Sequence, residues 1–328
     1  MEPISPSSLL NGSKKHASCQ IPEPAAALFF NGECMKYRLL LVLAALIWGS
    51  AFVAQVVGMD TIGPFTFGGV RFLLGSASLL PFIYMNRHKE NPKSTKISLW
   101  AAFLMTGLPL FAAATIQQVG LQFTTASKAS FLTANYILLV PFFGLFLGHP
   151  LRLTHLVGAV TAITGVYLMS IKSDFTISPG DLMMLLCAIF FSLQILALDY
   201  LTQRFDPVLL SSGQFFVTGI LNLVLAFMYE TPTWTGIEGA MGALLYTGIL
   251  SSGVAYTLQA VGQKYMPPTE ASMILSLEMV FGGLSGVLFL GDTFTERQMA
   301  GIAAMCIGVF VSQLPSRAIL RLREKPIS

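Results

Sequence analysis

The chain has 328 residues, of which 54% are hydrophobic and only 11% are charged, and its formal net charge is +3. Soluble domains carry roughly 25% charged residues, so this composition excludes a soluble domain and indicates an integral membrane protein. The basic residues do not form the stripe that is typical of nucleic-acid binding.

Cysteine and histidine do not form a metal or redox motif in this sequence. None of the four cysteines stands in a C-x-x-C pair, and there is no H-E-x-x-H pair or Walker-type glycine loop. Catalysis needs a convergent set of titratable groups, and the sequence does not display one. We therefore predict no cofactor, no metal and no enzymatic activity.

Residues 1–34 precede the first apolar run and do not predict regular structure. They contain prolines and serines with only a short apolar patch, and they lack the basic start and longer apolar core of a signal peptide. We expect a disordered N-terminal extension, which is not translated at all if synthesis begins at Met35.

Ten apolar segments follow, each about as long as a membrane-spanning helix. Their approximate bounds are 38–58, 64–85, 99–119, 125–147, 153–171, 179–200, 208–229, 239–262, 267–290 and 296–315. We therefore expect an all-α integral membrane protein with ten transmembrane helices.

The connections between these segments differ in basic content. Thirteen Lys and Arg residues fall on one side, namely Lys36, Arg38, Arg87, Lys89, Lys93, Lys96, Arg152, Arg204, Lys264, Arg317, Arg321, Arg323 and Lys325. The other side has only Lys172 and Arg297. Because cytoplasmic loops are enriched in Lys and Arg, we expect both termini, including a basic tail at 316–328, on the cytoplasmic side of a plasma or bacterial inner membrane.

The sequence also contains an internal repeat. Residues 117–130 align without gaps with 259–272, 142 positions later, and polar and glycine positions stay in register. Hydrophobicity alone would not preserve that register. We therefore interpret 36–172 and 179–315 as two copies of one five-helix unit.

Each repeat has an odd number of helices, and this number determines how the two repeats are oriented relative to one another in the membrane. A unit that begins on one side of the membrane ends on the other, so the second copy is inverted. Inverted repeats are the architecture of many secondary transporters, in which the substrate site lies near the bilayer midplane between the repeats. The pattern predicts a transporter that works by alternating access.

Short motifs stand at characteristic places in this frame: W-G-S-A-F at 48–52, V-R-F at 70–72, L-E at 277–278 and L-G-D at 290–292. Together they resemble the EamA type of the drug/metabolite transporter superfamily, over about residues 36–315. The resemblance implies a central cavity lined by helices one to four and six to nine, and transport of small polar metabolites such as amino acids. The family often has Glu-Pro where this chain has Glu278-Met279, so the resemblance does not decide whether the ninth helix is kinked there.

Glu278 is the single charge near the middle of the ninth segment. An ionisable group at the bilayer centre costs about 2.5–3.5 kcal/mol on insertion scales, so it normally faces protein or a wet cavity. We expect Glu278 to bind the solute and to be a candidate proton carrier. The alternative is a carboxyl that only holds helices together.

Further polar side chains lie in segments where lipid would leave them without partners. The predicted substrate-binding set comprises Trp48, Gln55, Gln117, Asn135, Tyr136, Gln194, Tyr256 and Gln259, together with Glu278. For each amide the alternative is a hydrogen bond between helices. Arg71 either extends to the headgroups or pairs structurally, or its planar guanidinium binds a carboxylate of the solute.

Two smaller features concern helix packing and helix ends. Gly158 and Gly165 recur as Gly301 and Gly308, each pair seven residues apart and so on one helix face. These faces pack within the chain or form a homodimer through helices five and ten. Lys128 is expected to be a solvated charge at a helix end.

These observations favour a secondary transporter that exports a small polar metabolite, with proton coupling as an added hypothesis. Its partners would be that solute, protons and the lipid bilayer. One alternative is a flippase for a lipid headgroup or lipid carrier, which would need a lateral opening and basic residues at the cavity mouth. The other is a membrane enzyme, for which clustered catalytic groups are missing.

Overall fold

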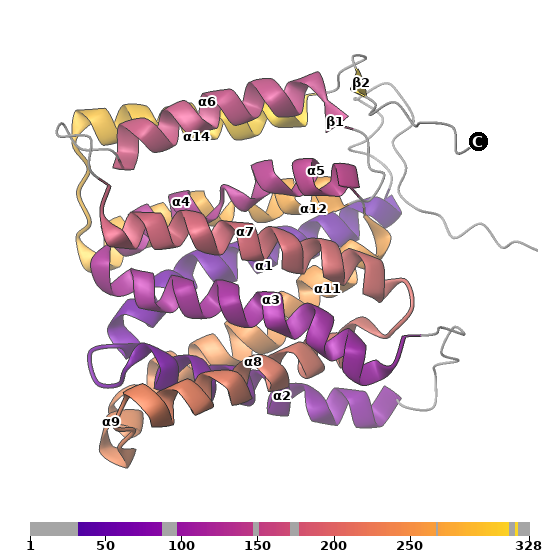
Figure 1. Cartoon of the computed structure of the whole chain (residues 1–328), viewed down its shortest axis with the longest axis vertical. Coiled ribbons are helices and arrows are strands. Elements are labelled where there is room, and N and C mark those ends of the chain that lie inside the picture. Colours follow the sequence, from indigo (N-terminus) through magenta and orange to yellow (C-terminus); the bar gives the residue numbers. More distant parts are fainter. Residues whose placement is uncertain are drawn as a thin grey trace, which may run out of the picture.

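The computed structural model describes residues 32–86, 97–146, 151–170, 177–266, 268–314 and 319–320. Its helices lie side by side in one bundle (Figure 1). The first repeat comprises α1 (Gly32–Gly58), α2 (Pro64–Asn86), α3 (Leu99–Gly120), the 3-10 turn η3 (Leu121–Phe123), α4 (Ala126–Thr133), α5 (Tyr136–Phe146), β1 (Leu151–Arg152) and α6 (Leu153–Ser170).

The second repeat contains more separate elements than the first, because its helices are interrupted more often. It comprises α7 (Pro179–Thr202), α8 (Pro207–Tyr229), α9 (Trp234–Gly239), α10 (Met241–Leu245), the π-helix η4 (Tyr246–Ala255), α11 (Tyr256–Tyr265), α12 (Pro268–Leu275), α13 (Glu278–Ser285), the π-helix η5 (Gly286–Leu290) and α14 (Glu296–Gln313). The strand β2 (Ile319–Leu320) follows and pairs antiparallel with β1.

Within the described residues, nine helical stretches are long and apolar enough to cross a membrane. The tenth predicted span is α14, which has 18 residues. Its polar first turn, Glu296 to Gln298, lowers its hydropathy, but it lies alongside the spanning helix α6 (Figure 1). The prediction of an all-α membrane protein with ten spanning helices is thus confirmed. The expected extension at 1–34 and tail at 316–328 lie outside the described residues, apart from 32–34 and β2.

Several helices begin at residues whose side chains cap the first turn. The side chains of Ser98, Thr125, Ser178, Asp206 and Thr295 each accept a hydrogen bond from a backbone N–H three residues later. Because the first backbone N–H groups of a helix lack intrahelical partners, these caps fix where the spans start.

The glycines of α6 and α14 show the two-fold relation between the repeats. A Cβ atom on Gly158 would lie 2.5 Å from the carbonyl oxygen of Gly308, and one on Gly308 would lie 2.6 Å from that of Gly158. Gly165 and Gly301 are related in the same reciprocal way, at 2.6 and 2.8 Å. The glycine faces therefore pack α6 against α14 within the chain. A homodimer through these helices remains a prediction and would have to use their other faces.

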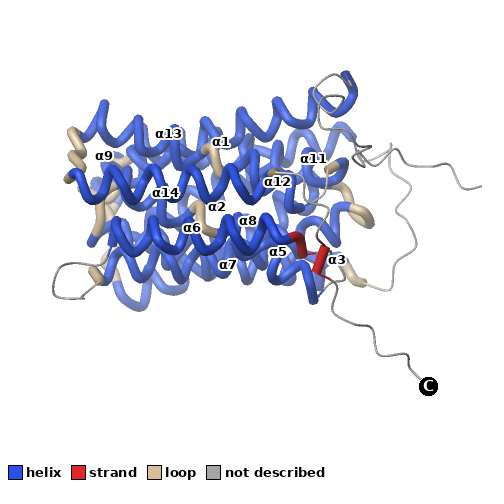
Figure 2. The backbone as a smooth tube through the Cα atoms, turned by 90° about the horizontal axis from the view of Figure 1, so that it is seen from above, coloured by secondary structure: helices blue, strands red, loops and turns tan. Residues whose placement is uncertain are grey.

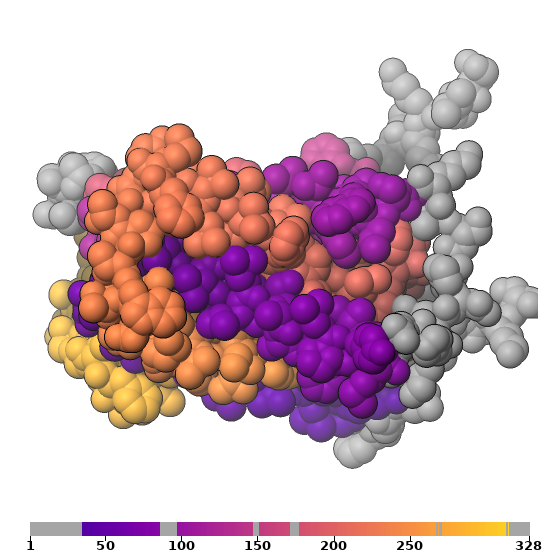
Figure 3. All heavy atoms as spheres, turned by 90° about the horizontal axis from the view of Figure 1, so that it is seen from below, coloured from indigo at the N-terminus to yellow at the C-terminus, as the bar shows by residue number. Residues whose placement is uncertain are grey.

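Two pairs of equivalent helices form opposite edges of the bundle. The pair α6 and α14 lies at one edge and the pair α2 and α8 at the other (Figure 1). In the space-filling view from below, orange residues of the second repeat lie beside violet residues of the first (Figure 3). The repeats are therefore interleaved, and the space between the edges is enclosed by both.

The two ends of the bundle are distinct. We call the end that carries α9 the α9 end, and the end that carries the paired strands the β1 end (Figures 1 and 2). The α9 end also holds the connection from α1 to α2 and the turn η3.

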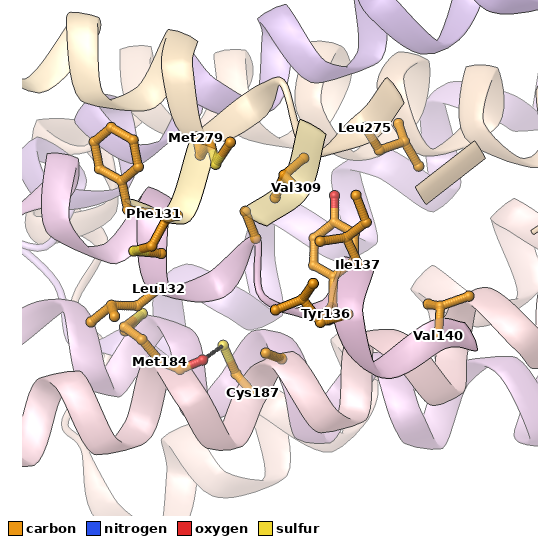
Figure 4. Packing of buried hydrophobic residues seen from close by; sticks show 14 of the residues in the cluster. Phe131, Leu132, Tyr136, Ile137, Val140, Met184, Cys187, Leu275, Met279 and Val309 are labelled. Atoms are coloured by element: carbon orange, nitrogen blue, oxygen red, sulfur yellow. Dashed lines mark hydrogen bonds between the residues drawn. The ribbon is translucent and has the colours of Figure 1, made fainter. Parts of the chain in front are cut away.

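The largest buried apolar cluster surrounds the interrupted helices. Met184 and Cys187 from α7 pack on one side of Tyr136, and Leu275 and Met279 lie on the other side (Figure 4). Packing of this kind holds the two interruptions in place near the centre of the bundle.

Candidate functional site

Two helices are broken at equivalent positions in the middle of the bundle. The first break separates α4 from α5 at residues 134–135, and the second separates α12 from α13 at 276–277. At each break the backbone tightens: Ile137 N–H bonds to the carbonyl of Ala134, and Met279 N–H to that of Ser276, three residues back. The ninth span is therefore interrupted without a proline, which answers the question that Met279 raised.

Each break places a candidate residue at the start of a half-helix. Tyr136 is the first residue of α5 and Glu278 the first of α13. Discontinuous helices of this kind form the substrate and ion sites of many inverted-repeat transporters, because their ends expose backbone dipoles at the midplane.

Both half-helices border a central cavity with a volume of about 40 Å³. Its lining includes nine of the ten predicted site residues: Trp48, Gln55, Arg71, Gln117, Tyr136, Gln194, Tyr256, Gln259 and Glu278. A volume of this size holds a few water molecules. A solute of amino-acid size requires the surrounding helices to move apart.

Arg71 is buried and turns inward. Its side chain is only 4% exposed, its Nη1 donates a hydrogen bond of 2.7 Å to Oε1 of Gln55, and its guanidinium carbon lies 4.6 Å from the centre of the Phe72 ring. Its Nε has no hydrogen-bond partner among the described residues. The guanidinium therefore lines the cavity and does not extend to the headgroups.

Glu278 supplies the opposite charge to the same cavity. Its side chain is 5% exposed, and its Oε1 lacks a hydrogen-bond partner within the described part of the chain. Tyr136 lines the same cavity, and its hydroxyl also has no hydrogen-bond partner there. Buried polar groups are normally hydrogen-bonded, so these unpartnered atoms are exceptional.

Amides form a short chain along another wall of the cavity. Gln259 donates to Gln194 at 3.5 Å, and Gln194 donates to Gln214 at 3.1 Å, while Oε1 of Gln259 has no partner among the described residues. On the first repeat, Gln117 donates to the hydroxyl of Thr133 at 3.3 Å. These amides therefore bond between helices and also line the cavity, and their predicted contact with the substrate stays a prediction.

Trp48 lines the cavity and also contacts the π-helix η4. Its Nε1 donates to the carbonyl oxygen of Ser251 at 3.2 Å, and its ring meets Tyr256 edge-on with centroids 4.6 Å apart. The wider turns of η4 bring Ser251 and Ser252 to the cavity wall. π-Helical turns occur frequently at functional sites.

The structure places some residues differently from the sequence interpretation. Asn135 does not line the cavity, since its amide donates to the carbonyls of Phe131 and Leu132 at the helix break. Sequence reasoning missed further lining residues, namely Phe52, Phe72, Thr133, Phe191, Ile195, Ser251 and Ser252. Phe191 could have been found, because it stands 143 positions after Trp48.

At the α9 end, acidic side chains of the second repeat bind the first. Asp181 forms an ion pair with Lys128, so the prediction of a solvated Lys128 was wrong. Asp181 also accepts from the Thr124 hydroxyl. Asp292 accepts from the backbone N–H of Ser127 at 2.9 Å. Glu230 accepts from the backbone N–H groups of Phe65 and Thr66, both at 2.8 Å. These contacts hold the repeats together at this end.

Interleaved inverted repeats, broken central helices and a polar cavity between them define the class of inverted-repeat membrane transporters. The sequence pattern of the EamA-like transporter family matches both halves of the chain, residues 35–171 and 178–314. The chain belongs to this family.

Similar proteins agree with this assignment. An uncharacterized transporter of Archaeoglobus fulgidus is 32% identical over 84% of this chain and 84% of its own length. The transporter YoaV of Bacillus subtilis is 24% identical over 85% and 97%, and a WAT1-related chloroplast protein of Arabidopsis thaliana is 24% identical over 84% and 69%. A solved crystal structure superposes with a TM-score of 0.64 at 19% identity, over 85% of this chain and 96% of that one, and so shares the fold.

Proposed function

We propose that this transporter exports a small polar metabolite with both an acidic and a basic group, such as an amino acid or a related zwitterion, by alternating access. One observation carries the proposal: Arg71 and Glu278 are both buried and line the same cavity. A guanidinium suits a carboxylate, and a carboxylate suits an ammonium group. Uncharged amide and phenol groups between them can exchange hydrogen bonds with water when the solute leaves.

The cavity lining favours a metabolite carrier over a lipid flippase. Among the described lining residues Arg71 is the single cation, whereas a headgroup flippase would need several basic residues at the cavity mouth. Substrate-sized volume must come from a change in conformation, as alternating access requires.

Orientation and location are part of the same proposal. The thirteen basic residues on one side support a cytoplasmic position for both termini and an outside position for the α9 end, in a cell membrane. Export is then movement from the β1 end to the α9 end.

Counterflow into proteoliposomes tests the proposal. A panel of amino acids, amines lacking a carboxylate, carboxylates lacking an amine, and nucleosides would be offered to the wild-type chain and to Arg71→Lys. We expect zwitterions to exchange fastest, and Arg71→Lys to slow carboxylate-bearing solutes by roughly 30-fold, the factor for about 2 kcal/mol, while amines are unaffected.

The outcome against the proposal is equally specific. Exchange of nucleosides but not of zwitterions would reject the substrate class. If Arg71→Lys slows the counterflow of all solutes equally while expression is normal, Arg71 has a structural role.

A further inference from the structure

A second and larger cavity lies at the α9 end. Its volume is about 420 Å³, against about 40 Å³ for the central cavity. Polar groups from both repeats line it, among them Thr61, Thr66, Gln122, Glu230, Thr231 and Thr233. This cavity, which we call the vestibule, has room for a metabolite in the present conformation, unlike the central one.

The two cavities share three helical segments of the first repeat. Gln55 of α1 lines the central cavity, and Met59, the first residue after α1, lines the vestibule; on α2, Arg71 lines the central cavity and Thr66 the vestibule. Gln117 and Gln122 repeat the pattern on α3 and η3. Because a helix rises about 1.5 Å per residue, separations of four or five residues place the vestibule about 6–8 Å beyond the central cavity.

A layer of contacting side chains lies at the level between the two linings. Arg71 and Gln55 are hydrogen-bonded to each other, and the amide of Gln118 donates to the carbonyl of Gln55 at 3.4 Å. The buried ring of Phe67 lies 5.7 Å from the Arg71 guanidinium and fills the space above Gly58. The layer is thus about one helical turn thick.

The vestibule wall suits a polar solute without holding it tightly. Its hydroxyl and amide groups both donate and accept hydrogen bonds. Its one acidic group, Glu230, is engaged at the start of α2, where both carboxylate oxygens accept from backbone N–H groups. A carboxylate at a helix N-terminus is partly neutralised by the helix dipole, so the wall is polar but nearly neutral.

We propose that the vestibule is a second, transient binding site on the transport path, which receives the small polar solute when the layer of Gln55, Phe67, Arg71 and Gln118 opens. The inference rests on the proposed transport function. It assigns a role to Gln122 and Thr231, which the sequence did not indicate.

A matched pair of cysteine substitutions tests the path. Thr231→Cys places a thiol in the vestibule wall, whereas Thr235→Cys places one on exposed α9 outside it. Modification with a bulky, membrane-impermeant thiol reagent should slow counterflow roughly tenfold or more in Thr231→Cys and leave Thr235→Cys unchanged. Gln122→Cys provides a second wall position. Unchanged rates at both wall positions, or equal slowing at Thr235→Cys, would overturn the proposal while the transport function stands.

A labelling measurement does not depend on transport. Thr66 and Thr106 are both buried threonines within spanning helices, and only Thr66 lines the vestibule. A small hydrophilic thiol reagent should label Thr66→Cys roughly tenfold faster than Thr106→Cys, after subtraction of the parent chain's own cysteines. Equal labelling rates would mean that the vestibule does not admit water, and the proposal would fail. Faster labelling without counterflow of any solute would instead reject the proposed function.

Discussion

Charged side chains are hydrogen-bonded between the repeats at the α9 end, whereas those of the central cavity keep atoms without a partner. At the α9 end, Asp181, Glu230 and Asp292 each accept hydrogen bonds from the other repeat. In the central cavity, Arg71 Nε and Glu278 Oε1 have no partner among the described residues. Asp181 is fully buried, as Arg71 and Glu278 nearly are, whereas Glu230 and Asp292 are half-buried. Because Asp181 is nevertheless hydrogen-bonded, burial alone does not explain the difference.

The contrast separates stability from recognition. A buried polar atom without a partner costs roughly 1–3 kcal/mol, whereas a satisfied hydrogen bond to a charged group stabilises by roughly 1.5–3 kcal/mol. Contacts at the α9 end therefore hold one conformation together. The unpartnered central atoms instead lower stability, as expected of groups that the proposed function assigns to solute binding.

The largest expected effect comes from removing the central acid. In Glu278→Gln, uptake driven by a pH gradient should be abolished, because the amide cannot carry a proton, while counterflow without a gradient should continue at a reduced rate. Reconstituted vesicles with and without an imposed gradient measure both. Gradient-driven transport that survives the substitution would show that Glu278 is not the proton carrier.

The next effect concerns the α9 end. Asp181→Asn breaks the ion pair with Lys128, whose side chain is 16% exposed while that of Asp181 is fully buried. We expect a loss of about 2 kcal/mol in the free energy of unfolding, measured in detergent by denaturant or heat. Asp206→Asn, at the N-terminal cap of α8, is a matched control with little expected change in the free energy of unfolding, because asparagine caps a helix about as well as aspartate.

A double substitution sharpens that measurement. Combining Lys128→Met with Asp181→Asn should destabilise the protein by less than the sum of the single changes, because the uncompensated charge is removed. If the two single changes in the free energy of unfolding add strictly, the ion pair contributes little to stability, as is usual for exposed ion pairs.

The smallest expected effects distinguish a residue at the helix break, Asn135, from a residue of the cavity wall, Gln259. Asn135→Ala should lower stability by about 1 kcal/mol through loss of the hydrogen bonds to Phe131 and Leu132, with little change in the KM for solute. Gln259→Ala should raise KM instead, since its carbonyl faces the cavity. Reversal of this pattern in paired kinetic and unfolding measurements would place Asn135 in the binding site.

Much of the architecture could be predicted because the membrane constrains it strongly. Apolar length indicated the spans, and the alignment of 117–130 with 259–272 indicated equivalent helices. Glu278 was recognisable because an acid at midplane needs a polar environment. By the same reasoning, amides such as Gln117 and Gln194 could be assigned to the interior.

Details that depend on local backbone geometry could not be predicted. The second break, at Ser276 and Leu277, has no proline, and its tightening arises from hydrogen bonds that reach back only three residues. The π-helix η4 has no counterpart in α3, so the repeat could not indicate that Ser251 faces the cavity. The Lys128–Asp181 pair joins residues that are far apart in sequence and occupy different repeats.

The reciprocal contact of Gly158 with Gly308 has a consequence for biosynthesis. Since α6 is made long before α14, its glycine face enters the bilayer without the backbone that will cover it. The packing of the first half is therefore completed only when translation has delivered the last helix of the second half.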